Sequence, residues 1–101
     1  MKYTKTNPTI VYEEFYKIAK PVKHFKSLTG KEYDVQSLIG NEMKFLRVTT
    51  GKIWSMDLKG VHLAYCELTD FKTVNFKSYL PRTHSPALGL LLYLGLLESN
   101  G

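Results

Sequence analysis

The sequence has 101 residues, of which 44% are hydrophobic and 23% are charged, and its formal net charge is +5 at pH 7. This length supports one hydrophobic core, and the composition excludes disordered, fibrous and low-complexity proteins. A single cysteine, Cys66, excludes an internal disulfide and a four-cysteine zinc cluster, so the cytoplasm is the expected compartment.

The first predicted element is a helix over residues 9–20. It follows a polar segment, 1–7, that lacks the apolar core of a secretory signal and that we expect to be flexible. Asn7 and Pro8 are typical of a helix start, as N-cap and first helical residue. Apolar residues then recur at i, i+4 and i+7, which predicts a wide buried stripe.

Residues 22–56 carry the signals of strands and turns. Glycine turns at Gly30, Gly40 and Gly51 separate runs that are rich in β-branched and aromatic residues and that alternate in polarity. This spacing is typical of consecutive hairpins. We therefore expect a four-stranded antiparallel β-meander over residues 22–28, 32–39, 42–49 and 52–56.

Asp57 is the expected N-cap of a second helix that ends near Leu68. Residues 69–79 hold regularly spaced aromatic and apolar residues, which favours an extended segment packed on the core. Together the elements predict an α+β fold in a single domain, 1–101. Its order is an N-terminal helix, a four-stranded antiparallel β-meander and two helices, of which the last is strongly apolar.

The last helix is predicted over residues 86–94, with Ser85 as N-cap, Pro86 as first helical residue and Gly95 as a left-handed stop. Leucines leave this helix no polar face, so it is either buried in the core or part of an interface with a second copy or another protein through residues 86–97. This apolar run is too short to cross a membrane, which takes about 20 residues.

The excess positive charge lies in the first third of the chain. Residues 1–31 hold seven Lys and two Glu, a net charge of +5, whereas the remainder is neutral. Tyr16 and Phe25 stand among the lysines, and such a mixture suits phosphate backbones and stacked bases. A solvated, lysine-rich face that only maintains solubility is the alternative. The predicted nucleic-acid contacts are Lys17, Lys20, Lys23, His24, Lys26 and Lys31.

A second candidate site precedes the last helix. Arg82, His84 and Ser85 lie where free backbone N–H groups and the positive end of the helix dipole favour an anion. They predict a phosphate or carboxylate site. In the alternative interpretation, Ser85 caps the helix and Arg82 is solvated.

Two weaker patterns could carry chemistry. Asp57, Asp70 and Lys72 match the loose pattern of a metal-dependent nuclease, in which two carboxylates hold Mg²⁺. The pattern also occurs by chance in many sequences, and a helix cap and a surface loop explain these residues adequately. His62 and Cys66 are spaced i, i+4, which could place two metal ligands on one helix face, but a third ligand is lacking nearby.

We therefore expect a small, non-catalytic binding module without a metal or cofactor, which contacts nucleic acid through its lysine-rich first third. One alternative is a protein-interaction or oligomerisation subunit that uses the apolar C-terminal helix. Another is a small metal-dependent nuclease or other phosphate-handling enzyme.

Overall fold

The structure is a computed structural model that describes residues 3–27 and 29–99. It has the predicted α+β architecture, but a strand and not a helix comes first. Strand β1 (Tyr3–Lys5) pairs antiparallel with β6 (Leu97–Ser99) in a separate two-stranded sheet. Part of the segment expected to be flexible, 1–7, therefore forms a strand, because it finds a partner at the opposite end of the chain.

The predicted four-stranded antiparallel meander is confirmed, and its strands lie in sequence order. Gly40 and Gly51 adopt φ of +60° and +70° in two of its turns, a conformation that glycine adopts without steric cost. A bulge interrupts the register between Val35 and Ser37. The strands are β2 (His24–Lys26), β3 (Glu32–Ile39), β4 (Glu42–Arg47) and β5 (Ile53–Asp57).

The first helix, α1 (Tyr12–Ala19), begins later than predicted. Asn7 and Pro8 lie instead in a turn, in which the Asn7 carbonyl accepts from the Ile10 amide at 3.1 Å. The second helix, α2 (Leu58–Glu67), confirms its predicted cap, because the Asp57 carboxylate accepts from the Lys59 amide at 3.0 Å.

Residues 69–79 are not a continuous extended segment, because η1 (Thr73–Ser78) is a 3₁₀ helix. The Asn75 side-chain amide donates to the Asp70 carbonyl at 2.9 Å, which closes the chain into a compact turn. Phe71 and Phe76 are buried, as expected of a segment packed on the core, whereas Val74 is 62% exposed.

The last helix, α3 (His84–Tyr93), begins before the predicted Pro86, and its N-cap is Thr83 rather than Ser85. The Ala87 amide donates to the Thr83 carbonyl at 3.0 Å, so the helical bonds already include these residues. Pro86 fits inside this first turn because the first amides of a helix need no intrahelical acceptor.

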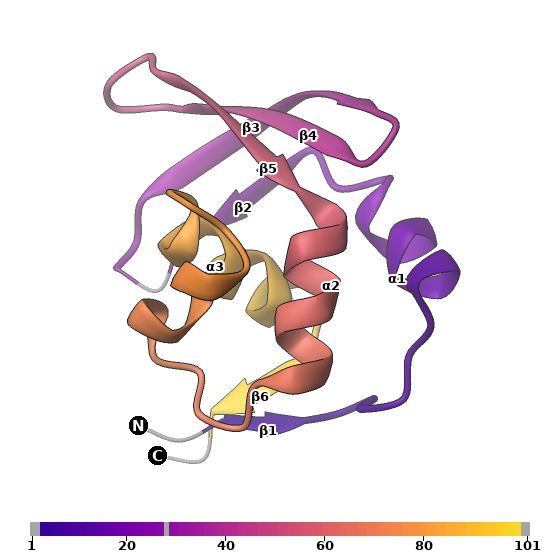
Figure 1. Cartoon of the computed structure of the whole chain (residues 1–101). Helices are drawn as coiled ribbons and strands as arrows, with labels where there is room; N and C mark the ends of the chain where they lie inside the picture. Colours follow the sequence, from indigo (N-terminus) through magenta and orange to yellow (C-terminus); the bar gives the residue numbers. More distant parts are fainter. Residues whose placement is uncertain (1–2, 28, 100–101) are drawn as a thin grey trace.

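The helices and the sheet enclose one core. Figure 1 shows α2, α3 and η1 below one face of the meander, with α1 beside α2 and the β1–β6 pair on the far side of the helices. Leu88, Leu90 and Leu91 of α3 are at most 1% exposed, so most of the apolar helix lies in the core, whereas Leu92 and Leu94 are half-buried. None of the described helices is long and apolar enough to cross a membrane.

Candidate nucleic-acid interface

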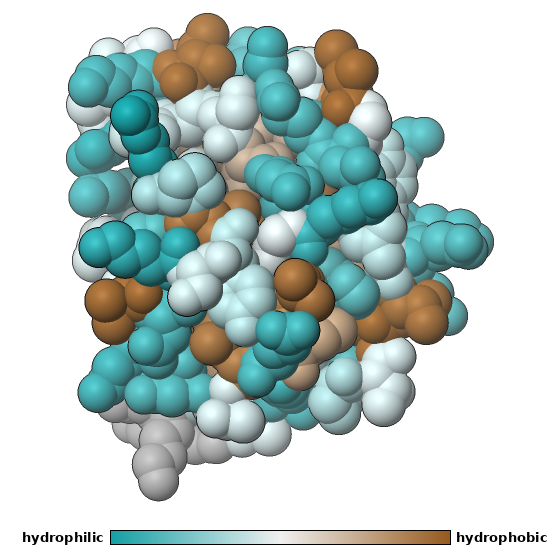
Figure 2. Space-filling view, viewed as in Figure 1, coloured by the Kyte–Doolittle hydropathy of each residue, from teal (hydrophilic) through white to brown (hydrophobic). Residues whose placement is uncertain are grey.

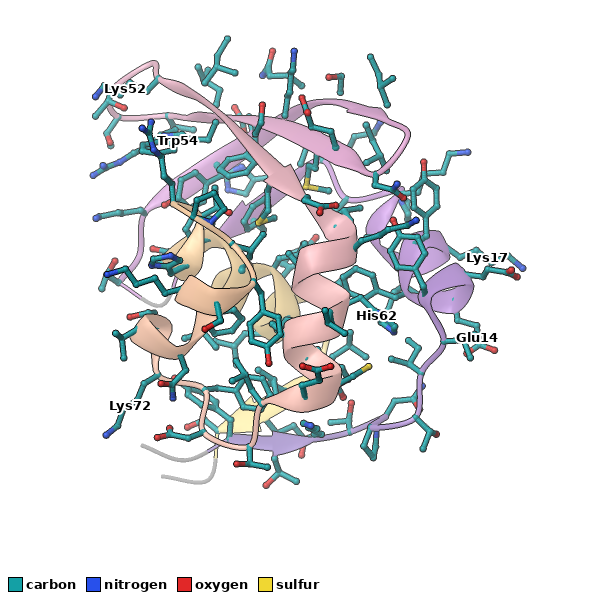
Figure 3. The ribbon with its side chains drawn as sticks, in the orientation of Figure 1. Glu14, Lys17, Lys52, Trp54, His62 and Lys72 are labelled. Carbon is teal, nitrogen blue, oxygen red and sulfur yellow. The ribbon has the colours of Figure 1, made fainter. Side chains whose placement is uncertain are left out.

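Five lysines of the predicted interface follow one another along the chain from α1 to the start of β3. Lys17 is in the last turn of α1 and Lys20 is its C-cap, Lys23 lies between α1 and β2, Lys26 ends β2, and Lys31 directly precedes β3. All five are exposed. Within residues 3–27 and 29–99, no carboxylate lies within 4.0 Å of their ammonium groups. Figure 3 shows Lys17 projecting away from α1. We call these five residues the lysine strip.

His24 differs from the lysines because both of its ring nitrogens face carboxylates. Its Nδ1 lies 2.6 Å from Asp34 Oδ1, and its Nε2 lies 3.4 Å from Glu32 Oε1. Glu32 is also the cross-strand partner of Lys26. His24 is therefore occupied within the sheet, and Lys26 stands opposite an acidic residue of β3.

The aromatic residues that alternate with the lysines in the sequence do not offer a stacking surface. Phe25 is fully buried, and its ring packs against Tyr33 and Phe45 with centroids 5.3 and 5.5 Å away. Tyr16 is half-buried beside Tyr12. The strand period explains Phe25, because residues on either side of an inward-facing position point outward.

A different aromatic residue lies beside the strip. Tyr93 of α3 is 58% exposed and, with Leu92, lines a shallow groove of about 420 Å³ against His24 and Lys26 of β2. No local pattern in the sequence indicates this neighbourhood, because it depends on how α3 packs against β2. A β-carbon at Gly89 would overlap the Lys26 carbonyl, so only glycine permits the approach.

The three predicted anion-binding residues have different environments. His84 Nε2 donates to the Leu80 carbonyl at 2.8 Å, Ser85 is half-buried inside the first turn of α3, and Arg82 is exposed. The imidazole is thus engaged by the backbone rather than directed at a ligand. Anion binding at this helix start stays a prediction.

The three residues of the nuclease pattern do not lie around one common point. Asp57 and Asp70 lie beyond opposite ends of the ten-residue helix α2, which at about 1.5 Å per residue separates them by roughly 15 Å. The Asp70 carboxylate accepts from the Lys72 amide at 3.4 Å within its own loop. In the part of the chain that the structure describes, no three His, Cys, Asp or Glu side chains gather as a metal site.

His62 and Cys66 do meet on α2, with Sγ 3.5 Å from Nε2. That nitrogen also faces the Ile10 carbonyl at 2.8 Å, so it carries the proton and donates to the carbonyl. Burial raises the pKa of the Cys66 thiol, an effect that Glu67 reinforces and Lys5 opposes. His62 therefore links α2 to the segment that precedes α1, and the pair does not form an activated thiolate.

No known protein family, curated protein or solved structure matches the chain. The function must therefore be inferred from this chain's own residues. Two features support the inference: the lysine strip, which forms no ion pair with the described residues, and Tyr93, which lies next to Lys26.

Proposed function

We propose that this protein is a non-catalytic module that binds nucleic acid through phosphate contacts of the lysine strip. The observation that carries the proposal is that five exposed lysines follow one another along the segment from α1 to the start of β3. None of them is neutralised by a carboxylate within the described residues. Such an array attracts a polyanion because each contact releases counterions from the phosphate backbone.

The kind of recognition follows from the residue types. Lysine ammonium groups are point charges that contact phosphates without reading base edges, so the strip supplies affinity and little sequence preference. Tyr93, beside Lys26, offers a ring on which an unpaired base can stack. We therefore expect single strands to bind more tightly than duplexes of the same sequence.

The rival interpretation is a solvated face that only keeps the protein soluble. It predicts that the position of the lysines does not matter for nucleic-acid binding, because any equal loss of positive charge would lower the affinity by the same factor. The proposal predicts the opposite, since lysines along one segment contact one strand together.

The test compares two variants that lose the same charge. One changes Lys17, Lys20, Lys23 and Lys26 to Gln; the control changes the exposed residues Lys44, Lys52, Lys72 and Lys77 to Gln. The probes are fluorescent single-stranded DNA and RNA of mixed sequence. The first variant is expected to lose at least tenfold in affinity while the control retains most of it. Equal losses in both variants, or no binding by the wild type, would leave the solvated face as the better account.

A further inference from the structure

The two edge strands of the meander, β2 and β5, have different neighbours in the rest of the fold. At the β2 edge, α3 packs so closely that Gly89 meets the Lys26 carbonyl and the Ser27 Cα. At the other edge, β5 runs beside a groove of about 690 Å³. Its far side is the segment Tyr79–Thr83, which passes below β5 in Figure 1. One edge is thus covered, and the other is open.

The hydrogen-bond register shows which backbone groups face the groove. The Lys52 carbonyl accepts from the Arg47 amide at the end of β4, and the Leu58 amide donates to the Asn41 carbonyl. Because every second residue of an antiparallel strand bonds to the same neighbour, the backbone N–H and C=O groups of Trp54 and Met56 also face β4. Ile53 and Ser55 therefore direct their N–H and C=O groups away from the sheet. Within residues 3–27 and 29–99, no backbone hydrogen bond from outside the meander reaches these groups.

The opposite wall is held firmly in place. Leu80 is 2% exposed and packs against Gly60 of α2, and its carbonyl accepts from His84. The Tyr79 hydroxyl donates to the Glu67 carboxylate at 2.9 Å. A groove with a fixed wall and a ready strand edge binds an extended chain at a small cost in ordering.

Trp54 lines the groove, and its side chain projects from β5 on the side of the segment that leads into α3 (Figure 3). Its indole Nε1 is buried and has no hydrogen-bond partner among the described residues, so a bound strand would meet the rest of the ring. Ile53 is 65% exposed on the other face of the strand. In the space-filling view the region below β5 is hollowed, and hydrophobic side chains are visible at its base (Figure 2).

We propose that the groove binds an extended peptide segment of a partner protein, which adds to β5 as a fifth strand of the meander. The alternating side chains of the peptide would meet Trp54 on one face and Ile53 on the other, so apolar residues fit there. Glu42 and Asp57 are cross-strand partners in the lining, and they outnumber Arg82, which also lines the groove. The two carboxylates favour a Lys or Arg at their end of the peptide.

A second copy of this chain fits the groove less well than a free peptide does. The β5 of a second copy is bordered by its own β4 on one side and by its own Tyr79–Thr83 segment on the other. A single extended segment carries no such neighbours, so it can lie between the β5 edge and the opposite wall.

The test uses proline to remove one outward-facing amide. Ser55→Pro deletes an N–H that forms no bond within the meander, so the fold is expected to persist, and circular dichroism checks this. Ser55→Ala is the matched control because it keeps the amide. The probe is a random peptide library selected on the immobilised full chain, followed by the enriched peptides as synthetic ligands.

Enriched peptides should combine alternating apolar residues with a Lys or Arg. They should bind the wild type and Ser55→Ala, lose at least tenfold in affinity for Ser55→Pro, and slow hydrogen exchange at Ile53 and Ser55. Glu42→Lys should disfavour the basic residue. The proposal is overturned if no peptide is enriched, or if the enriched peptides bind Ser55→Pro as tightly as the wild type. A wild-type dimer that Ser55→Pro converts to a monomer would also overturn it, since the edge would then belong to a second copy.

Discussion

Gly89 of α3 lies against the backbone of Lys26 at the edge of β2. A β-carbon at position 89 would overlap the Lys26 carbonyl oxygen and would stand 2.8 Å from the Ser27 Cα. Both obstacles are backbone atoms, which cannot move aside as a flexible side chain can. This approach joins α3 to the sheet and brings Tyr93 next to the lysine strip.

Gly89→Ala should therefore destabilise the protein by about 3 kcal/mol, at the upper end of the usual range for overpacking. The measurement is the free energy of unfolding in urea. Tyr93→Ala, a change at an exposed site on the same helix, serves as the control and should cost much less. A Gly89→Ala variant as stable as the wild type would show that α3 does not pack on β2 in this way.

Tyr65 connects α2 to both ends of the chain. Its hydroxyl donates to the Leu96 carbonyl at 2.9 Å and accepts from the Asn7 amide at 3.1 Å. Tyr65→Phe leaves both groups without this partner, which should cost about 1–3 kcal/mol. Hydrogen exchange in β1 and β6 should accelerate more than exchange in the meander. Uniform acceleration, or none, would contradict a local role for this hydroxyl.

Cys66 should react with thiol reagents only at elevated pH. Burial raises the pKa of the thiol, so at a given pH less of the reactive thiolate is present than in the unfolded chain. The alkylation rate of the folded protein should thus reach its midpoint at a higher pH than that of the protein unfolded in urea. Because Lys5 lowers the pKa, Lys5→Met should shift the midpoint further upward. A midpoint at or below that of the unfolded chain would contradict the raised pKa of the Cys66 thiol.

Tyr93 should contribute to the binding of single-stranded nucleic acid through its ring. Stacking of one base is worth about 1–3 kcal/mol, so Tyr93→Ala should weaken single-strand binding by roughly 5- to 150-fold, with little effect on duplex binding. Tyr93→Phe keeps the ring and should retain the affinity. If Phe and Ala at this position weaken binding equally, the hydroxyl and not the ring is involved.

Local signals were enough to predict the meander and the start of α2. The glycine turns and the Asp57 cap act between near neighbours in the sequence, and the structure keeps them. The Asn7–Pro8 signal was misleading, because the Asn7 amide is used by Tyr65 and the helix begins only at Tyr12. The pairing of β1 with β6 had no local signal, since it joins short segments from the two ends of the chain.

The candidate site could be predicted only in part. The lysines are exposed, as charged residues usually are, but His24 faces Asp34 across the strand and Phe25 enters the core. Strand alternation alone could have placed Phe25 inside. Tyr93 and the open β5 edge depend on packing between distant elements, which the order of residues does not reveal.

The dependence of binding on salt tests the central claim about the lysine strip most directly. For a single strand, each phosphate contact contributes about −0.7 to the slope of log K against log salt concentration. Replacing Lys17, Lys20, Lys23 and Lys26 by Gln should therefore make the slope shallower by about 2.8 units if each lysine neutralises one phosphate. Replacing Lys44, Lys52, Lys72 and Lys77 should leave it nearly unchanged. Identical slopes for the two variants would contradict the proposal that the lysine strip is the nucleic-acid interface.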